Sequence, residues 1–212
     1  MPRLGRSTAR WAVLGSVLVV VAVLAVALAI RPTPSDGGPA RATGAMSSAP
    51  ATTTDPPRST SAPPEHLTIA SIGVSTDLVS LGLRPDRTVE VPADAALAGW
   101  FDQGPVPGQL GSSVILGHVD SEAGPAVFHA LPELSPGAAI DVRRADGTVA
   151  RFEVDRVATY ANEDFPAQEV YAGSPEESAL NLVTCGGTYD AARGGWQSNV
   201  VVFATFAGIR TS

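Results

Sequence analysis

The only cysteine of the chain, Cys185, stands at the end of a short apolar run in the segment ALNLVTCGGTYD at 179–190. Side-chain alternation puts it on the same strand face as Asn181 and Val183. The two glycines that follow let the backbone turn sharply, so that amides can point at an oxyanion. Free cysteine is often only a buried packing residue. A thiolate presented at a strand end, next to a cationic neighbour, is instead a nucleophile.

Among the three histidines, His118 is the best partner for that thiol, because it closes the apolar run SSVILGHV at 112–119. A polar ring at the end of a buried strand is where a rigid scaffold presents a catalytic group. A structural histidine bonded to nearby backbone is the alternative reading. His66, beside the linker, is expected to be solvated, and His129 lies in a candidate helical turn. His118 and Cys185 at strand ends therefore predict a Cys–His acyl-transfer site.

The elements that must position these groups are mostly strands, because short runs of period two or brief apolar runs alternate with Gly, Pro and Asp. Asp146-Gly147, between two alternating runs, is the strongest hairpin signal. The predicted strands are 66–74, 88–92, 112–119, two within 138–160, 179–185 and 199–206. Helical turns are predicted only at 126–134 and 174–180. About seven or eight strands with few helices favour one all-β domain, a closed or nearly closed barrel or a sandwich.

The chain before this domain has a different composition. The run 11–30 has no charged residue and is long enough to cross a bilayer, and three arginines precede it. We therefore assign 1–31 to a cytoplasmic N-terminus and transmembrane anchor, with everything after it outside the membrane. A cleaved secretory signal is the alternative. Residues 32–65, rich in Pro, Ser, Thr and Ala, are expected to form a disordered stalk, which leaves 66–212 as the folded domain.

Composition excludes several classes of function. The chain has 14 basic and 21 acidic residues, of which residues 1–65 hold six and three, so 66–212 has eight basic and 18 acidic side chains. Such an acidic domain is a poor candidate for binding nucleic acid. No lysine is present, which excludes Schiff-base and P-loop lysine chemistry. A single cysteine excludes an internal disulfide. We see no acidic calcium loop, and we predict neither a metal nor a cofactor.

Three motifs resemble those of the sortases, membrane-anchored cysteine transpeptidases of Gram-positive bacteria. GHVD at 117–120 is similar to their histidine motif, LVTCGG at 182–187 to their cysteine motif, and NVVVFAT at 199–205 to their last strand. Longer runs, at 99–128, 165–172 and 185–190, resemble the actinobacterial branch called class F.

The resemblance implies a closed eight-stranded β-barrel with short helical turns. It makes Cys185 the acyl-enzyme nucleophile and His118 the general acid/base. The substrate would be a protein with a C-terminal LPXTG-type sorting signal, cut between Thr and Gly and held as a thioester. The acyl group would then pass to an amine acceptor on peptidoglycan or on a pilin.

One position departs from the family. Sortases have an arginine near the start of the last strand, which stabilises the substrate carbonyl and its oxyanion, but here Gln197 or Asn199 stands there. The nearest arginine is Arg193, in the preceding loop. We assign the role to Arg193 and keep Asn199 and Gln197 as alternatives.

Two other functions fit parts of the sequence. A non-catalytic, membrane-tethered β-barrel binding module accounts for the anchor, the stalk and the acidic domain, but it leaves the Cys–His pair as a coincidence. An L,D-transpeptidase-like enzyme also uses Cys and His, but its histidine is expected shortly before the cysteine, whereas His118 and Cys185 are far apart in the sequence.

Overall fold

The structure is a computed structural model, and it describes residues 62–211. Its strands are β1 (Pro64–Ile69), β2 (Val74–Leu81), β3 (Ala98–Phe101), β4 (Gly111–Gly117), β5 (Asp120–Ser121), β6 (Gly124–Pro125), β7 (Ala139–Arg144), β8 (Thr148–Ala161), β9 (Ser178–Asp190) and β10 (Gly195–Thr211). Its short helical segments are η1 (Ala70–Ile72), η2 (Leu131–Glu133), η3 (Asn162–Asp164), η4 (Gln168–Ala172) and η5 (Ala191–Arg193). This confirms the predicted all-β class with few helices.

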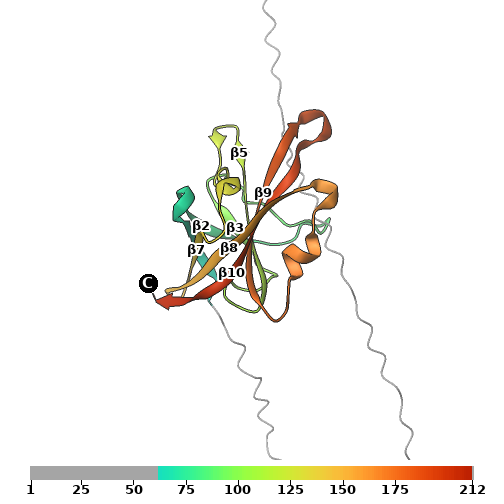
Figure 1. Ribbon diagram of the computed structural model, residues 1–212. Helices are drawn as coiled ribbons and strands as arrows, with labels where there is room; N and C mark the ends of the chain where they lie inside the picture. The colour runs from blue at the N-terminus through green and yellow to red at the C-terminus, as the bar shows by residue number, and fades with distance from the viewer. Residues whose placement is uncertain (1–61, 212) are drawn as a thin grey trace, which may run out of the picture. The chain divides into compact units, whose positions relative to one another are not determined.

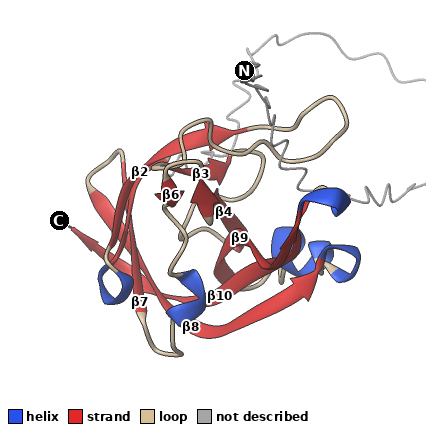
Figure 2. Cartoon of the chain, turned by 90° about the horizontal axis from the view of Figure 1, so that it is seen from above, coloured by secondary structure: helices blue, strands red, loops and turns tan. Residues whose placement is uncertain are grey.

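Eight strands close a barrel in the order β1-β2-β3-β4-β9-β10-β8-β7, and β5 and β6 form a separate hairpin. The view from above shows the strands arranged in a ring, with the short helical segments on the connections between them (Figure 2). Most neighbours are antiparallel, but β2 pairs with β3, and β4 with β9, in parallel. Closure pairs the edges of a twisted sheet, which removes exposed strand edges.

Alternating side chains of the barrel strands fill the interior. Leu67, Ile115, Phe152, Leu180 and Val202 are all fully buried there. Because inward and outward residues alternate along a strand, the neighbours of these residues form an outer face. The inner core therefore fixes which side chains of β4 and β9 point outward.

A second apolar cluster covers that outer face over β3, β4, β9 and β10. It includes Val89 from the β2–β3 connection (82–97) and Val170 from the β8–β9 connection (162–177). They pack against strand residues that include Val114, Val183 and Val201, all nearly or fully buried. The two long connections thus flank the face from which Cys185 is presented.

Most predicted strands are present, with differences at their ends. The run 66–74 is not one strand: β1 and β2 are separated by η1 because Gly73, at φ 68°, turns the chain. The predicted strand 88–92 is reduced to an isolated bridge between Leu83 and Val89. The strand β3 was not predicted, since its four residues are too few to show a period.

The helical turn predicted at 174–180 is wrong. Ser174 accepts a hydrogen bond from the Glu176 amide within a turn, and β9 already begins at Ser178. The helical turn of this region lies earlier, at η4, where Val170 is buried against the second apolar cluster. Tertiary burial therefore overrode the local capping signal.

The predicted membrane anchor and nearly all of the predicted stalk lie outside the described residues. Within 62–211 no helix is long and apolar enough to cross a membrane. Strand β1 begins at Pro64, so it includes the last two residues that we assigned to the stalk.

Candidate active site

Strand register brings His118 and Cys185 together. The parallel pairing of β4 with β9 sets Leu116 opposite Val183. Two residues further along each chain, His118 comes directly after the end of β4, whereas Cys185 lies within β9, which continues to Asp190 beyond the strand end that we predicted. Neighbouring strands lie about 4.8 Å apart, so the two groups are presented at one level. Both side chains line the same small pocket.

The β2–β3 connection closes this pocket. Val91 forms one wall, and the pocket volume is only about 20 Å³. A single water needs a cavity of about 10–15 Å³. The pocket as it stands is therefore too narrow to hold a peptide, although the Cys185 side chain is itself partly exposed.

The His118 ring is bonded to the same segment. Its Nε2 lies 2.8 Å from the carbonyl oxygen of Pro92, and because a carbonyl only accepts, Nε2 is the donor in this contact. In a neutral ring Nδ1 is then the nitrogen that can take a proton. The contact does not decide between the two readings of His118. The ring makes the backbone hydrogen bond expected of a structural histidine, and it also lines the same pocket as the only thiol.

The Cys185 thiol is protonated in this closed state. Burial raises its pKa to about 11, and the negative charge of Asp120 contributes in the same direction. At pH 7 only about one molecule in 10⁴ then has a thiolate. Because the thiolate is the reactive form, this protonation lowers the reactivity of the thiol in the state that the structure shows.

Comparisons with known proteins agree with this geometry. The family model described as "Sortase domain" matches residues 67–207, which is most of the chain. The chain belongs to the sortase family. The match includes both motifs and at least part of every barrel strand, so the family-level resemblance of the sequence is confirmed.

Solved structures show the same fold at low identity. Sortase A from Corynebacterium diphtheriae has a TM-score of 0.54 and 18% identity, over 70% of this chain and 62% of that one. Sortase C-3 from Streptococcus pneumoniae has a TM-score of 0.52 and 15% identity, over 69% of this chain and 63% of that one. A Clostridium perfringens sortase D5 transpeptidase has a TM-score of 0.50 and 21% identity, over 69% of this chain and 79% of that one. The chain thus spans less than two thirds of the first two structures. No curated protein matches the sequence.

In this sortase domain, the three candidates for the arginine role lie in different places. Asn199 pairs with Cys185 across β9 and β10, is 5% exposed and lines the catalytic pocket. Its Nδ2 donates to Asn162 Oδ1 at 3.0 Å, which leaves its second amide hydrogen available. Gln197 donates to the Gly195 carbonyl at 2.7 Å. Arg193 is exposed in η5, outside the residues that line the pocket.

A second contact connects the two hairpins above the site. The Trp196 indole Nε1 donates to Asp120 Oδ1 at 3.1 Å, and the ring of Trp196 meets Tyr189 edge to face at 5.6 Å. In Figure 1 the β9–β10 hairpin and the hairpin labelled β5 project from the same end of the barrel. Asp120, which raises the thiol pKa, is therefore held in position by the strand that contains Asn199.

Sequence reasoning missed several residues that shape the pocket. Val91 and Pro92 come from a connection with no recognisable motif, and Asn162 follows β8, far from both motifs in the sequence. Thr184 also lines the pocket, and its buried hydroxyl has no hydrogen-bond partner among residues 62–211. The same part of the chain holds no group of three His, Cys, Asp or Glu side chains suited to a metal ion.

Proposed function

We propose that this sortase is a cysteine transpeptidase that cleaves an LPXTG-type sorting signal through a thioester on Cys185. One observation carries the proposal: His118, directly after β4, and the only cysteine, within the adjacent parallel strand β9, line one pocket of a sortase-family barrel. The arrangement suits nucleophilic acyl transfer, which needs a thiol, a proton carrier and a donor to an oxyanion.

The reaction is written in two steps. The Cys185 thiol gives its proton to His118, and its sulfur attacks the threonine carbonyl carbon of the signal. The Thr–Gly bond breaks, His118 protonates the leaving amine, and a thioester remains. An acceptor amine then attacks the thioester, His118 takes the amine proton, and the new amide leaves as the thiol re-forms. Asn199 donates its second amide hydrogen to the oxyanion formed in each step.

Substrate binding has to open the pocket. Displacing Val91 and Pro92 makes room for the peptide and releases His118 Nε2 from its carbonyl partner. A released and protonated ring also stabilises a thiolate beside it. The raised thiol pKa of the closed state therefore describes the resting enzyme and not the substrate complex.

The proposal places the enzyme on the outer side of a membrane. The uncharged run 11–30 and the three arginines before it support an anchor with a cytoplasmic N-terminus. The runs similar to class F support an actinobacterial branch, and the acceptor is an amine on peptidoglycan or on a pilin.

The test is to incubate the full chain, purified in detergent, with a library of LPXTG-like peptides and an amine acceptor. Intact-mass spectrometry should show a peptide adduct on Cys185 that is lost on adding the amine, and the ligated product should appear. Absence of both adduct and product for every peptide would overturn the proposal.

The closed pocket specifically favours a second function, a tethered binding module that never forms a thioester. Native-state alkylation separates the two functions. In a transpeptidase, a cognate peptide opens the pocket, so it changes the rate at which Cys185 reacts with iodoacetamide. In a binding module, Cys185 stays inert with or without peptide until the protein unfolds.

A further inference from the structure

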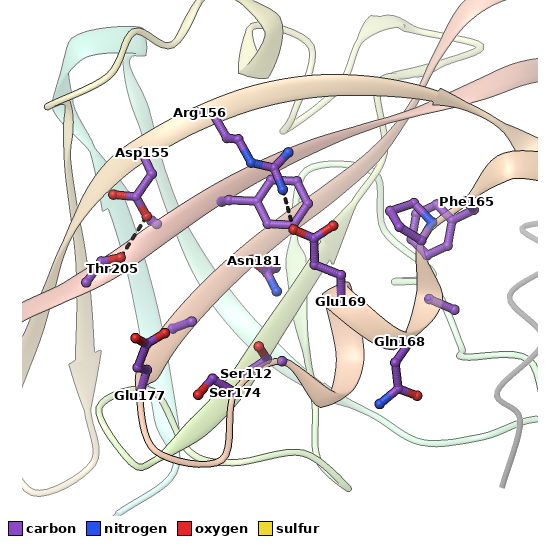
Figure 3. A pocket seen from close by; sticks show the side chains of 16 residues that line it. Ser112, Asp155, Arg156, Phe165, Gln168, Glu169, Ser174, Glu177, Asn181 and Thr205 are labelled. Carbon is purple, nitrogen blue, oxygen red and sulfur yellow. Dashed lines mark hydrogen bonds and ion pairs between the residues drawn. The ribbon is translucent and has the colours of Figure 1, made fainter. Parts of the chain in front are cut away.

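A second hollow lies on the same face as Cys185 but shares no lining residue with the catalytic pocket. It is a groove of about 800 Å³ beside the β8–β9 connection, and Figure 3 shows its side chains. Asn181, four residues before Cys185 on β9, lies at its floor. Between the two hollows, buried Val170 and Val183 pack together. The groove is therefore separate from the site already described.

The charge of the groove is negative. Its only cation, Arg156, is paired with Glu169, donates to Tyr160 Oη at 2.9 Å and stacks 3.5 Å above the Phe203 ring. Asp155 and Glu177 also line the groove, and neither is paired with a cation in residues 62–211. Asp155 accepts only from the Thr205 hydroxyl, at 2.7 Å. The carboxylates of Asp155 and Glu177 thus have no neighbouring cation to neutralise their charge.

The groove also presents buried polar groups that lack partners. Ser112 is 2% exposed and lines the groove, and its hydroxyl makes no hydrogen bond with any described residue. Asn181, also 2% exposed, donates to the Val170 carbonyl at 2.7 Å, which leaves its side-chain oxygen to accept. Gly173, at φ 55°, keeps the floor open, since a Cβ there would lie 2.0 Å from Ser112 Oγ. Buried polar groups are normally satisfied, so these point to a ligand.

We propose that this groove is a subsite for a basic side chain, Arg or Lys, upstream of the cleaved bond in the sorting peptide. The aromatic rings of Phe165 and Phe203 accommodate an aliphatic stem, while Asp155 and Glu177 receive its charged head. The inference rests on the proposed function, because it treats the ligand as part of the same peptide.

Distance sets which residue reaches the groove. Four residues of β9 separate Cys185 from Asn181, or about 13 Å at about 3.3 Å per residue. An extended peptide acylated on Cys185 covers this with four residues, so the basic side chain stands about five to seven positions upstream. The upstream part is bound in the first transition state but not in the free peptide, so contacts made to it raise kcat/KM for acylation.

The experiment measures kcat/KM of the full chain with peptides that have a single Arg, Ala or Glu at each position from four to eight upstream, and likewise downstream. Arg at one upstream position should exceed Ala, and Glu should be worst. Asp155→Asn and Glu177→Gln should each reduce the preference for Arg about two- to fivefold, as expected for exposed charge pairs. The matched control is Glu133→Gln, an exposed carboxylate outside the groove, which should leave the preference unchanged.

A charge swap and a binding assay make the result decisive. Glu177→Arg should reverse the preference, so that the Glu peptide becomes the better substrate. Fluorescence anisotropy of the same peptides on full-length Cys185→Ala should show the same order, even if no turnover occurs. Equal binding of Arg, Ala and Glu peptides at every upstream position, or a preference only downstream, would overturn the subsite. Failure of acylation alone would overturn only the proposed function.

Discussion

The catalytic pocket and the acidic groove lie on the same face of β9, four residues apart, yet they differ in volume, polarity and access. The pocket holds about 20 Å³, is closed by Val91 and contains a thiol whose pKa is raised to about 11. The groove holds about 800 Å³, is open at its rim and has two carboxylates without a paired cation. One region is built for chemistry and is shut, while the other is built for recognition and is accessible.

The difference indicates an order of events. We expect a flexible peptide to enter the open groove without any change in the protein, whereas seating it in the narrow pocket beside Cys185 is expected to displace Val91 and Pro92. Binding energy gained at the groove is then available to open the pocket, which links recognition of the correct substrate to exposure of the thiol. The predictions below test this division, from the largest expected effect to the smallest.

The largest effect is expected for Cys185→Ala, because the comparison assigns all covalent chemistry to the pocket. No thioester and no ligated product should form, while peptide binding persists. The thiol is partly exposed and alanine is close to it in size, so the melting temperature should change little. Intact-mass spectrometry, product analysis and circular dichroism measure the three quantities. Product formation at the normal rate by the alanine variant would sink the mechanism.

His118→Ala should reduce kcat by roughly 10²–10⁴-fold, the usual contribution of a general acid/base. Peptide binding should be retained, since His118 does not line the groove. The loss of the bond to Pro92 should at the same time loosen the closing segment and speed alkylation of Cys185. A lower melting temperature with near-normal turnover would instead identify a purely structural histidine.

Asn199→Ala should reduce kcat/KM roughly 10- to 100-fold, less than the loss of a charged oxyanion donor. Arg193→Ala and Gln197→Ala should stay within about twofold, because neither side chain lines the pocket. Asn162→Ala is the control for positioning: it removes the partner of Asn199 but not the donor, so its effect should be intermediate. A damaging Arg193→Ala together with a silent Asn199→Ala would restore the arginine assignment.

The sequence correctly predicted strands that lead to His118 and Cys185, because the signals there are local, although β9 continues past Cys185 to Asp190. Period-two alternation, the glycines beside His118 and Cys185, and the Asp146-Gly147 turn each depend on a few neighbouring residues. The same alternation placed Cys185, Asn181 and Val183 on one face, as the two apolar clusters confirm. These features need no information about distant parts of the chain.

What closes the pocket could not be predicted in the same way. Val91 contacts the site through the packing of a connection that has no motif, and its position depends on β2, β3 and the second apolar cluster together. Arg193 was the nearest arginine in sequence, but cross-strand register decides which side chain lies beside Cys185, and that residue is Asn199. The helical turn was misplaced for a related reason, since burial of Val170 is a tertiary effect.

Val91→Ala tests whether the closing segment limits access. Burying a methylene is worth about 0.8 kcal/mol, so trimming a half-buried valine should make opening, and alkylation of Cys185 by iodoacetamide, about fivefold faster. Val79→Ala is the matched control, because Val79 packs against the second apolar cluster and does not line the pocket. Equal alkylation rates for the two variants would show that the segment containing Val91 does not limit access to the thiol.

The smallest effect concerns the charge beside the thiol. Because Asp120 helps to raise the Cys185 pKa, Asp120→Asn should lower that pKa and increase the thiolate fraction at any pH below it. A thiolate of lower pKa is also a weaker nucleophile, with a Brønsted slope of about 0.5, so alkylation at pH 8 should rise only about two- to threefold. In the wild type the rate should climb about tenfold per pH unit between 7 and 10 and level off only above about 11, and the variant should level off at a lower pH.

The control variant separates the charge of Asp120 from its hydrogen bond. Asparagine at 120 keeps an oxygen that accepts from Trp196, whereas Trp196→Phe removes that hydrogen bond and leaves the charge. The second variant should therefore leave the plateau of the pH profile in place. If both variants shift it equally, the hairpin contact and not the carboxylate charge sets the thiol pKa.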